Sequence, residues 1–578
     1  MKRLKTLVRR TAGLYLAVLL TVPVLAAEPL DPAKRQEDLD ILYEEVLMKG
    51  HPNAFANASE AEFLALKAEI EGRLETVIDT EFLLDLMRLT ALVGDSHTSI
   101  SVGSAAAFRA YPFALVRTGT GYGERWYLSA VPSEHEALLC QEVTALAGEP
   151  VGDVIDAFGT LFSADNPVHL KRQFRQACNV ADIYEYLGLV ETGEPLTIAL
   201  KNGESLTLEP MSMGEMGELG AARLSDRVEG TPETAAQDVC YFSKPLSEEV
   251  YYIQYNVCRE DEDLPMEEFA AQVAKDLEEG GYWRVLLDLR YNGGGSDGVI
   301  WPLLEVLRKE MDDEDGLELV GLIGERTFSS ALINAVEIQE MGGVLAGEPT
   351  GGSVCHFGAV RTFSLPNSKV RGQVSSKYID LNTLLDAAAG RGVVSLEPDE
   401  PLTQPLEHTL NGTDSVVEHM LTRKTCVPRL PLDNAPLTRG RFIGQLYAAA
   451  GSPDVEIGEA LPFADSFGIE WYLPALAWAK ENGIAKGYAD GTFSAAKPLT
   501  WREAAVFLGR AAGALGLSPD PAADRSGPVP GALAQGGDRD AAAAAWDLGL
   551  LPAEAGSNQG LTRAQGEALA ERLGSAIG

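Results

Sequence analysis

The spacing of apolar residues divides the chain into segments of different character. Between Asp31 and Leu92, apolar residues recur every three to four positions, which predicts amphipathic helices. A mixed pattern follows between Tyr111 and Pro210, with two short strand-like runs at Trp126–Val131 and Leu196–Leu200. We therefore expect a helical N-terminal part that leads into a mixed region.

Strands and helices alternate from about Val250 to Tyr378, which predicts a sheet covered by helices. The last helix of this segment begins near Ser329 and would place Leu332, Ala335, Val336 and Met341 on its apolar face. The other expected elements are strands at Tyr251–Tyr255, Val285–Leu289 and Leu317–Gly324 and a helix at Met266–Leu277.

The C-terminal part, beyond about Pro431, contains an internal repeat. Thr438, Thr500 and Thr562 each open a helical stretch, and they recur every 62 residues. A fixed period of this length indicates one supersecondary unit that is copied and packed against itself.

The N-terminus has the layout of a secretory signal peptide. Basic residues, among them Arg9 and Arg10, precede an apolar run from Ala12 to Val24, and small residues follow at Ala26 and Ala27. The run is shorter than the roughly 20 residues that span a bilayer. We expect export and cleavage after residues 1–27, with no transmembrane anchor left in the mature chain.

Composition and charge narrow the class of function. Hydrophobic residues make up 46% and charged residues 23%, which is typical of a folded soluble protein. The formal net charge of −38 disfavours binding to nucleic acid or anionic lipid. Six cysteines are scattered without the short spacing of metal ligands.

Ser329 and Ser330 are candidate nucleophiles because they stand where a strand passes into a helix. Backbone N–H groups and the helix dipole stabilise an oxyanion at such a position. A helix N-cap is the alternative role for either serine. The strand that ends in Asp288-Leu289-Arg290-Tyr291-Asn292-Gly293-Gly294-Gly295 supplies a glycine run whose amides face a ligand without side-chain obstruction. A tight turn without function also explains that run.

Ser296 is a rival nucleophile. Gly294-Gly295-Ser296-Asp297-Gly298 matches the nucleophile-elbow pattern of esterases and follows a strand directly. Against it, that fold expects an acid and then a histidine further along the chain.

His97 is the candidate base. It lies in Gly94-Asp95-Ser96-His97-Thr98, whose small polar residues can orient an imidazole, and an imidazole titrates in the range of a general base. A structural histidine is the alternative, and four other histidines remain possible substitutes: His51, His356, His408 and His419.

Four blocks in this order resemble the C-terminal processing (tail-specific) peptidases and their tricorn-core relatives. They are the block around His97, the Asp288 block, Thr327-Phe328-Ser329-Ser330-Ala331, and Gly347-Glu348-Pro349-Thr350-Gly351-Gly352. The resemblance covers about Leu39 to Lys424. It implies a crotonase-like β/α core with Ser329 as nucleophile and an oxyanion hole from the amides of Ser330 and of Gly293 or Gly294.

One position departs from the tail-specific pattern. Those enzymes use a lysine shortly after the Gly-Glu-Pro-Thr block, and this chain has Ser353 there. The tricorn-like branch uses a histidine preceded by a serine together with a glutamate. The resemblance thus assigns Ser96 and His97 to that pair and Glu397 to the acid. Val143–Gly148 is similar to part of a PDZ domain.

The C-terminal repeats resemble S-layer homology modules, which bind secondary cell-wall polysaccharide. The middle copy carries Phe463-Ala464-Asp465 and Gly487-Tyr488-Ala489-Asp490-Gly491-Thr492-Phe493. The family's Thr-Arg-Ala-Glu motif corresponds to the segments that begin at Thr438, Thr500 and Thr562. Arginine there suits an anionic glycan, and the candidates are Arg439, Arg502 and Arg563. A helical bundle that acts only as a spacer is the alternative.

Together these features predict an α/β (α+β) protein, exported and attached to the bacterial cell wall. The expected parts are a signal peptide (1–27), a helical cap (28–110), a mixed PDZ-like region (111–245), a crotonase-like peptidase core (246–424) and an α-helical domain of three S-layer homology repeats (431–578). The expected activity is hydrolysis of peptide bonds in a peptide or protein substrate through an acyl-enzyme. This serine-based hydrolysis requires no metal and no cofactor. A catalytically inactive peptide-binding protein and an esterase that uses Ser296 remain alternatives.

Overall fold

The computed structural model describes residues 30–577, apart from 103–107, 120–123, 313–315, 382–384, 424–436, 454, 456–461, 465–472, 496, 519–537, 553–554 and 556–559. The predicted signal peptide and Asp465 therefore lie outside the described residues. The chain forms two compact units, of which the first comprises Met1–Ala235, Phe357–Tyr378 and Thr403–Glu418. The second comprises Ala236–His356, Ile379–Leu402 and His419–Gly578.

The first unit begins with helices, as the apolar spacing predicts. Asp31 caps the first of them with its side chain, and Pro32 occupies the first turn, where a missing N–H costs nothing. A capping box between Ser59 and Glu62 starts α2. The helices are α1 Pro32–Asp40, which continues as the π-helix η1 Ile41–Met48, α2 Glu60–Glu71 and α3 Asp79–Ala91.

The mixed region forms an antiparallel sheet in the order β10-β4-β5-β7-β8, with β3 paired to β4 and β6 to β5. Its strands are β3 Ala114–Thr118, β4 Arg125–Pro132, β5 Glu142–Leu146, β6 Glu149–Pro150, β7 Leu196–Leu200, β8 Ser205–Leu208 and β10 Ala221–Arg223. Its helices are α4 Val151–Gly159, α5 Pro167–Ala177, α6 Ala181–Tyr186 and α7 Met213–Glu218. The predicted strand Leu196–Leu200 is confirmed to the residue, and Trp126–Val131 lies within β4.

A small sheet in the order β1-β18-β17 joins distant parts of the sequence within this unit. Its strands are β1 Ser99–Ile100, β17 Arg361–Ser364 and β18 Arg371–Val374. A short ladder pairs β2 Arg109–Ala110 with β9 Met211–Ser212.

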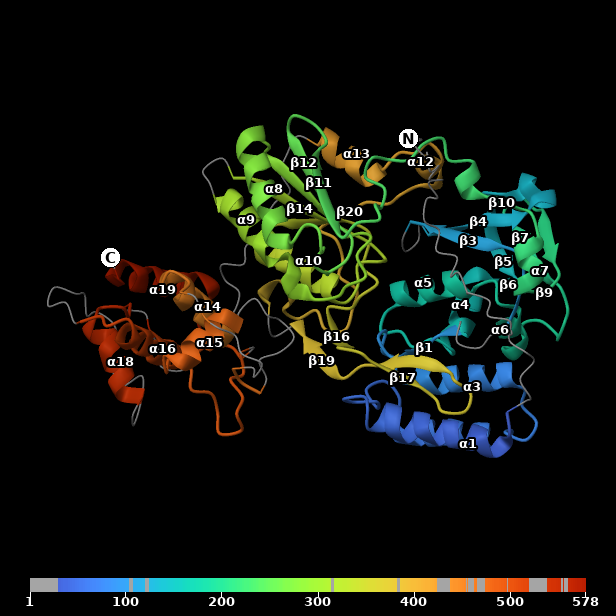
Figure 1. The fold of residues 1–578 in the computed structure, drawn as a ribbon, viewed down its shortest axis with the longest axis horizontal. Coiled ribbons are helices and arrows are strands. Elements are labelled where there is room, and N and C mark those ends of the chain that lie inside the picture. Colours follow the sequence, from blue (N-terminus) through green and yellow to red (C-terminus); the bar gives the residue numbers. More distant parts are fainter. Residues whose placement is uncertain are drawn as a thin grey trace, which may run out of the picture. The chain divides into compact units, whose positions relative to one another are not determined.

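The second unit contains a six-stranded sheet in the order β11-β12-β13-β14-β15-β20. All neighbours except β11 and β12 are parallel. The strands are β11 Tyr241–Pro245, β12 Val250–Tyr255, β13 Arg284–Asp288, β14 Glu318–Ile323, β15 Val344–Gly347 and β20 Glu400–Pro401. The connecting helices are α8 Met266–Gly280, α9 Trp301–Asp312 and α10 Ser330–Glu340, and α8 and α9 lie side by side beside the sheet (Figure 1).

The strands and helices predicted for this sheet are confirmed to within a few residues. β13 and β14 are buried along their whole lengths, as expected for parallel strands covered on both faces. Helix α10 differs from its amphipathic prediction, because all eleven of its residues are buried. The mixed α/β class is confirmed, and the crotonase-like topology stays a prediction.

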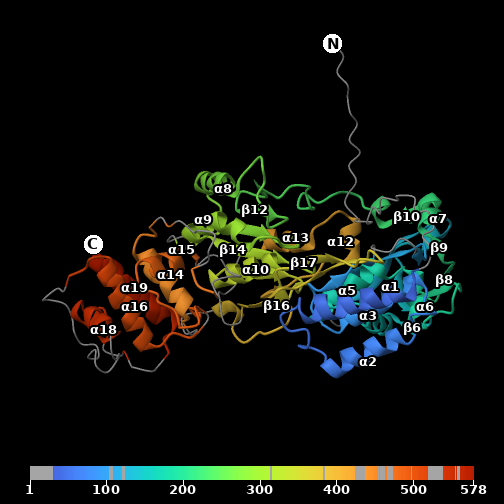
Figure 2. The same cartoon turned by 60° about the horizontal axis from the view of Figure 1, so that its bottom comes forward.

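The C-terminal repeats close into a ring. The N–H of Leu437 donates to the carbonyl of Leu561 (2.8 Å), that of Leu499 to Leu437 (2.7 Å), and that of Leu561 to Leu499 (3.0 Å). Each leucine precedes a threonine that starts a helix, and Thr500 forms a capping box with Glu503. The helices are α14 Arg439–Ala449, α15 Leu473–Glu481, α16 Trp501–Ala514, α18 Asp538–Asp547 and α19 Arg563–Ile577; Figure 2 shows α14, α16 and α19 gathered together.

Two further features bear on the sequence-based expectations. Within the described ranges, no helix combines the length and apolar character that crossing a membrane requires. Cys140, Cys178, Cys240, Cys258 and Cys355 are free thiols, and Cys426 lies outside the described residues.

Candidate active site

Three of the four sequence blocks meet at the carboxyl edge of the parallel sheet in the second unit. Because β13, β14 and β15 are parallel neighbours, the loops that follow them emerge at the same edge. The N–H of Phe328 donates to the carbonyl of Asn292 (3.2 Å), and the N–H of Gly352 donates to that of Thr327 (3.1 Å). The loops so joined are Asp288–Gly295, Thr327–Ala331 and Gly347–Gly352.

Ser329 occupies a strained turn between β14 and α10. Its φ of 54° and ψ of −127° lie in a region that costs a non-glycine residue on the order of 1–3 kcal/mol. Although Ser329 stands at the N-cap of α10, its side chain makes no capping hydrogen bond, so the helix-cap alternative is wrong for this serine. A serine on a strained strand-to-helix turn is the arrangement that exposes a nucleophilic Oγ.

The glycine run is fitted against Ser329. A Cβ on Gly294, whose φ is +103°, would lie 2.7 Å from the Cβ of Ser329. The N–H of Gly294 donates to Oδ1 of Asn292 (2.9 Å), whose side-chain amide in turn donates to the carbonyl of Tyr255 (3.0 Å). By contrast, Gly293 is exposed, and a Cβ there would meet nothing within 4 Å. Asn292 thus fixes the turn and engages the amide of Gly294, while Gly293 faces open space.

Ser330 joins the start of α10 to the same glycine run. Its hydroxyl donates to the carbonyl of Gly295 (2.8 Å). As the first residue of an eleven-residue helix, it carries an N–H without an intrahelical acceptor, at the positive end of the helix dipole. The geometry therefore provides an amide next to Ser329 at a place that favours negative charge.

Ser296 lacks the geometry of a nucleophile elbow. Its φ of −106° and ψ of 119° are ordinary extended values, and its side chain is exposed. The elbow requires the serine itself to sit on a strained turn. The rival esterase prediction therefore loses its structural basis at this residue.

Glu397, the predicted acid, is exposed on the segment that precedes β20. Its neighbour Leu396 donates its N–H to Oγ1 of Thr350 (2.9 Å), and the N–H of Thr350 donates to the carbonyl of Leu396 (3.1 Å). Glu397 thus follows a segment tied to the Gly347–Gly352 loop. Among the described residues, no hydrogen bond is recorded for its carboxylate.

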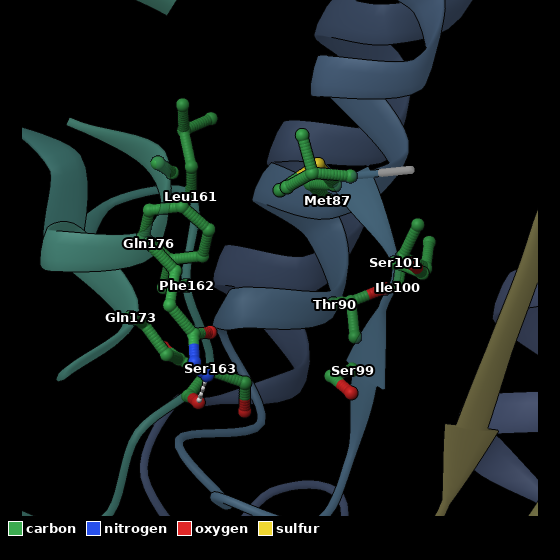
Figure 3. Close-up of a pocket in the computed structure, with 12 residues that line it drawn as sticks. Met87, Thr90, Ser99, Ile100, Ser101, Leu161, Phe162, Ser163, Gln173 and Gln176 are labelled. Carbon is green, nitrogen blue, oxygen red and sulfur yellow. Dashed lines mark hydrogen bonds between the residues drawn. The ribbon is translucent and has the colours of Figure 1, made fainter. Parts of the chain in front are cut away.

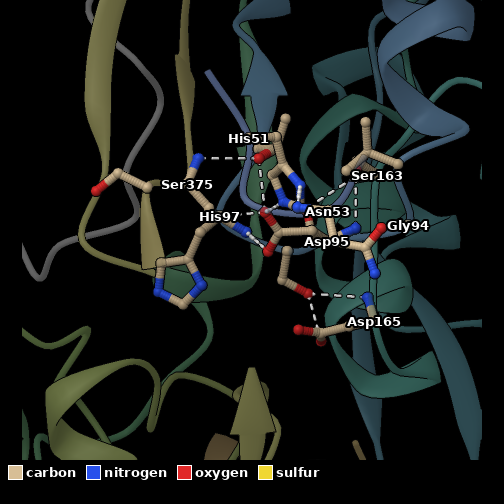
Figure 4. Close-up of polar contacts among 12 residues, drawn as sticks. His51, Asn53, Gly94, Asp95, His97, Ser163, Asp165 and Ser375 are labelled. Atoms are coloured by element: carbon tan, nitrogen blue, oxygen red, sulfur yellow. Dashed lines mark hydrogen bonds and ion pairs between the residues drawn. The ribbon is translucent and has the colours of Figure 1, made fainter. Parts of the chain in front are cut away.

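The block around His97 lies in the first unit and is organised by Asp95 (Figure 4). Asp95 is fully buried. Its carboxylate accepts hydrogen bonds from the backbone N–H of His97 (2.9 Å), the hydroxyl of Thr98 (2.6 Å) and the hydroxyl of Ser375 (2.6 Å). Nε2 of His51 lies 3.3 Å from the same carboxylate. In Figure 4 the imidazole of His97 points away from this cluster.

The carboxylate of Asp95 stays charged despite its burial. Burial alone raises its pKa, but the hydrogen bonds from His51, Ser375 and Thr98 and the charge of His97 outweigh it, so the pKa is lowered overall. By reciprocity, a charged Asp95 stabilises positive charge on His97. This is the electrostatic support that a general base needs when it holds a proton.

His51 has a structural role that uses both ring nitrogens. Nδ1 accepts from the N–H of Asn53 (3.1 Å), which leaves the proton on Nε2, facing Asp95. The ring also lies against Phe357, with centroids 4.5 Å apart. This arrangement disfavours His51 as the substitute base.

Ser96 is held by a carboxylate. Its hydroxyl donates to Oδ1 of Asp165 (2.6 Å) and accepts from the N–H of the same residue (3.1 Å). Ser96 therefore fixes the backbone that precedes His97. His408 and His419 are partnered elsewhere, by Ser415 and Glu400, and Nδ1 of the buried His356 faces the carbonyl of Ser353.

Glu337 is a buried carboxyl on the helix that begins next to Ser329. Burial raises its pKa to about 8, the charge of Asp297 adds to the rise, and a hydrogen bond from Asn334 (2.8 Å) opposes it. The folded chain therefore keeps a proton that the unfolded chain releases once the pH exceeds 4.5, the ordinary pKa of this carboxyl. The stability linked to this proton is fully present below pH 4.5 and is lost as the pH rises through about 8.

A Glu337→Gln protein is expected to lose this pH dependence, because glutamine keeps the acceptor for Asn334 and does not ionise. In the parent, the free energy of unfolding linked to this proton falls by on the order of 1.4 kcal/mol for each pH unit between the two pKa values. Thermal unfolding should show a Tm raised by about 5 °C at pH 9 and little changed at pH 5. Glu268→Gln, at an exposed position of α8, is the control. If parent and Glu337→Gln proteins follow the same pH profile, the buried proton is absent.

The three predicted glycan-binding arginines differ in environment. Arg439 is buried, pairs with Glu503 (2.8 Å) and lies against the rings of Tyr488, Phe493 and Phe507. Its guanidinium therefore joins the first repeat to the second. Arg502 is exposed, because Trp501 fills the buried position of the motif. Arg563 begins α19, and its side chain lies outside the described residues.

Several residues that build the site escaped sequence analysis. Asp95 belongs to the Gly94–Thr98 block, and its acidic side chain two residues before His97 was the signal that could have found it. Ser375 lies 280 residues from Asp95, and no spacing pattern links them. Asn292 also stands in a quoted block, but only the fold reveals that its side chain holds the amide of Gly294.

Comparisons with known proteins give one family match and several similar solved structures. The S-layer homology domain family model matches residues 462–505. A search of curated proteins finds no match. Among solved structures, mature CPAF has 13% sequence identity and a TM-score of 0.46, covering 67% of this chain and 96% of that chain. The photosystem II D1 C-terminal processing protease has 15% identity and a TM-score of 0.31, covering 66% of this chain and 98% of that chain.

Both parts of the predicted resemblance are confirmed at this level. An S-layer homology domain lies in the C-terminal part of the chain. The solved structures similar to the chain include CPAF and a C-terminal processing protease.

Proposed function

We propose that this chain is an exported serine peptidase held at the bacterial cell surface by its S-layer homology repeats. The observation that carries the proposal is the strained Ser329, which starts a helix, makes no capping bond and packs against a glycine loop. Backbone strain at a residue whose side chain makes no capping bond is characteristic of functional sites. The S-layer homology domain supports attachment to the cell wall.

In the proposed reaction, Oγ of Ser329 attacks the carbonyl carbon of the scissile peptide bond while His97 takes the hydroxyl proton. The amides of Ser330 and Gly293 stabilise the tetrahedral oxyanion. His97 then gives the proton to the leaving amine, and a water molecule hydrolyses the acyl-enzyme by the same route in reverse.

The supporting residues have distinct proposed tasks. Asp95 stabilises the imidazolium form of His97, and Ser96 positions the backbone beside it through Asp165. Glu397 is proposed as the acid on the strength of the sequence resemblance. We prefer Gly293 to Gly294 as an oxyanion donor because the N–H of Gly294 already donates to Asn292.

A serine-directed fluorophosphonate tests this proposal and separates its rivals. The probe should label the full-length protein once, and peptide mapping should place the label on Ser329, because only an activated serine reacts. Label on Ser296 would indicate the esterase alternative. A folded protein that takes up no label would be the inactive peptide-binding alternative.

Arg502 provides a test of wall binding. An Arg502→Ala protein is expected to bind isolated cell walls about threefold more weakly, because an exposed arginine contributes roughly 1 kcal/mol or less to an ion pair. Its Tm should not change, since the side chain is exposed. Lys486→Ala, also exposed in the middle repeat, is the charge-matched control. Equal loss in both variants would indicate attraction by net charge rather than by this position.

A further inference from the structure

A cavity of about 360 Å³ lies in the first unit beside Ser99, Ile100 and Ser101, which follow His97 closely in the sequence (Figure 3). Its volume is in the range of ligand sites. It is bounded by α3, by β1 and the two residues after it, by the loop before α5, and by α5 itself. Residues from these elements include Thr90, Ile100, Leu161, Phe162, Gln173 and Gln176.

The lining is neutral in a strongly acidic protein. No Asp, Glu, Lys, Arg or His borders the cavity among the described residues, and hydroxyl and amide groups alternate there with apolar side chains. Oε1 of Gln173 is buried and has no hydrogen-bond donor among the described residues, although its Nε2 donates to the carbonyl of Ser163 (3.3 Å). A buried acceptor is normally paired, so a ligand group or water that donates to Gln173 fits this place.

The strand beside the cavity has an open edge. Among the strands that the structure describes, β1 is the end strand of its sheet and pairs only with β18. The N–H of Ser101 donates to the carbonyl of Arg371 (3.1 Å), so Ser99 and Ser101 direct their backbone groups toward β18. In an antiparallel ladder the residue between them directs its N–H and C=O the opposite way. The backbone of Ile100 therefore faces away from β18, where an extended peptide can add as a further strand.

The cavity and the His97 block share structural elements. Ile100 lies three residues after His97, which in an extended chain is roughly 10 Å. Ser163, which borders the cavity, accepts from the N–H of Asp95 (2.8 Å) and donates to its carbonyl (2.8 Å). A peptide bound here would thus be placed by the same residues that orient the candidate base.

We propose that this cavity is a side-chain subsite of the peptidase, which takes a large uncharged residue of an extended substrate segment paired with the free edge of β1. The inference rests on the proposed function for its substrate class. The structural observations that support it all lie in the first unit. The cavity size and neutral lining select the side chain, and the open backbone groups of Ile100 hold the main chain.

Binding without turnover provides the first test. The full-length Ser329→Ala protein is incubated with a blocked alanine heptapeptide that carries phenylalanine at its centre, and with its aspartate counterpart. Hydrogen–deuterium exchange of residues 97–102 should slow about threefold or more with the phenylalanine peptide and remain unchanged with the aspartate peptide, because only bound peptide protects the edge amides. Equal protection by both peptides, or protection by neither, overturns the subsite.

A reciprocal charge exchange provides the second test. Gln176 borders the cavity, is exposed and forms no recorded hydrogen bond among the described residues. Gln176→Lys should raise cleavage of peptides with an acidic residue at one substrate position about threefold, and Gln176→Glu should do the same for basic residues. Ala65→Lys, on the exposed face of α2, is the control. Unchanged preferences in active Gln176 variants contradict the proposal and leave the peptidase function standing.

The two arms separate failure of the subsite from failure of the proposed function. Protection of residues 97–102 in a protein that never cleaves peptides would keep the binding site and remove the peptidase. Cleavage of peptides without selective protection of these residues would keep the peptidase and remove the subsite.

Discussion

A Ser329→Ala protein is expected to cleave a fluorogenic peptide at least about 10³-fold more slowly than the parent. The loss is large because the acyl-enzyme cannot form without the hydroxyl, whereas the oxyanion donors and substrate binding remain and leave a residual rate. The measurement is kcat/KM on the full-length protein, together with casein digestion.

Two variants make this result interpretable. Ser296→Ala should keep its activity within about twofold, because Ser296 is exposed and unstrained. Ser329→Gly should be as inactive as Ser329→Ala but more stable by about 1 kcal/mol, since glycine relieves the positive φ. A Ser329→Ala protein that cleaves as fast as the parent would exclude Ser329 as nucleophile.

The parallel sheet of the second unit was predictable because its strands are short apolar runs separated by helical periodicity. Helix α10 shows the limit of that reasoning. Its spacing predicts one apolar face, yet Asn334, Glu337 and Glu340 are buried with the rest. Periodicity reports on one covered face, and it cannot reveal that later segments of the chain cover the opposite face as well.

The candidate nucleophile was readable from sequence for a local reason. Ser329, the glycine run and the Gly347–Gly352 loop each follow a strand of one parallel sheet, and parallel topology brings such loops together. The network around Asp95 has no such local cause. It depends on Ser375 and Ser163, which fold back from distant segments and leave no periodic signal. The sequence also could not separate the predicted glycan-binding arginines. Arg439 and Arg502 occupy similar motifs, yet Arg439 is buried and Arg502 is exposed.

The contacts of the His97 block allow the proposed base to be tested separately from its surroundings. Burial raises the pKa of the Asp95 carboxyl, and the hydrogen bond from His51 and the charge of His97 together lower it. The N–H of His97 is also bonded to Asp95, so replacement of the side chain leaves this backbone contact in place. A side-chain variant of His97 can therefore remove the base without dismantling the block.

A His97→Gln protein is accordingly expected to lose at least about 10³-fold in kcat/KM while its Tm changes little. Because the base is needed to activate Ser329, labelling by a fluorophosphonate should slow in parallel. His408→Gln is the matched control: His408 is partnered by Ser415, and this variant should keep its activity within about twofold. Should His97→Gln stay active and His356→Gln become inactive, the base would belong to the second unit and the role of Asp95 would be structural alone.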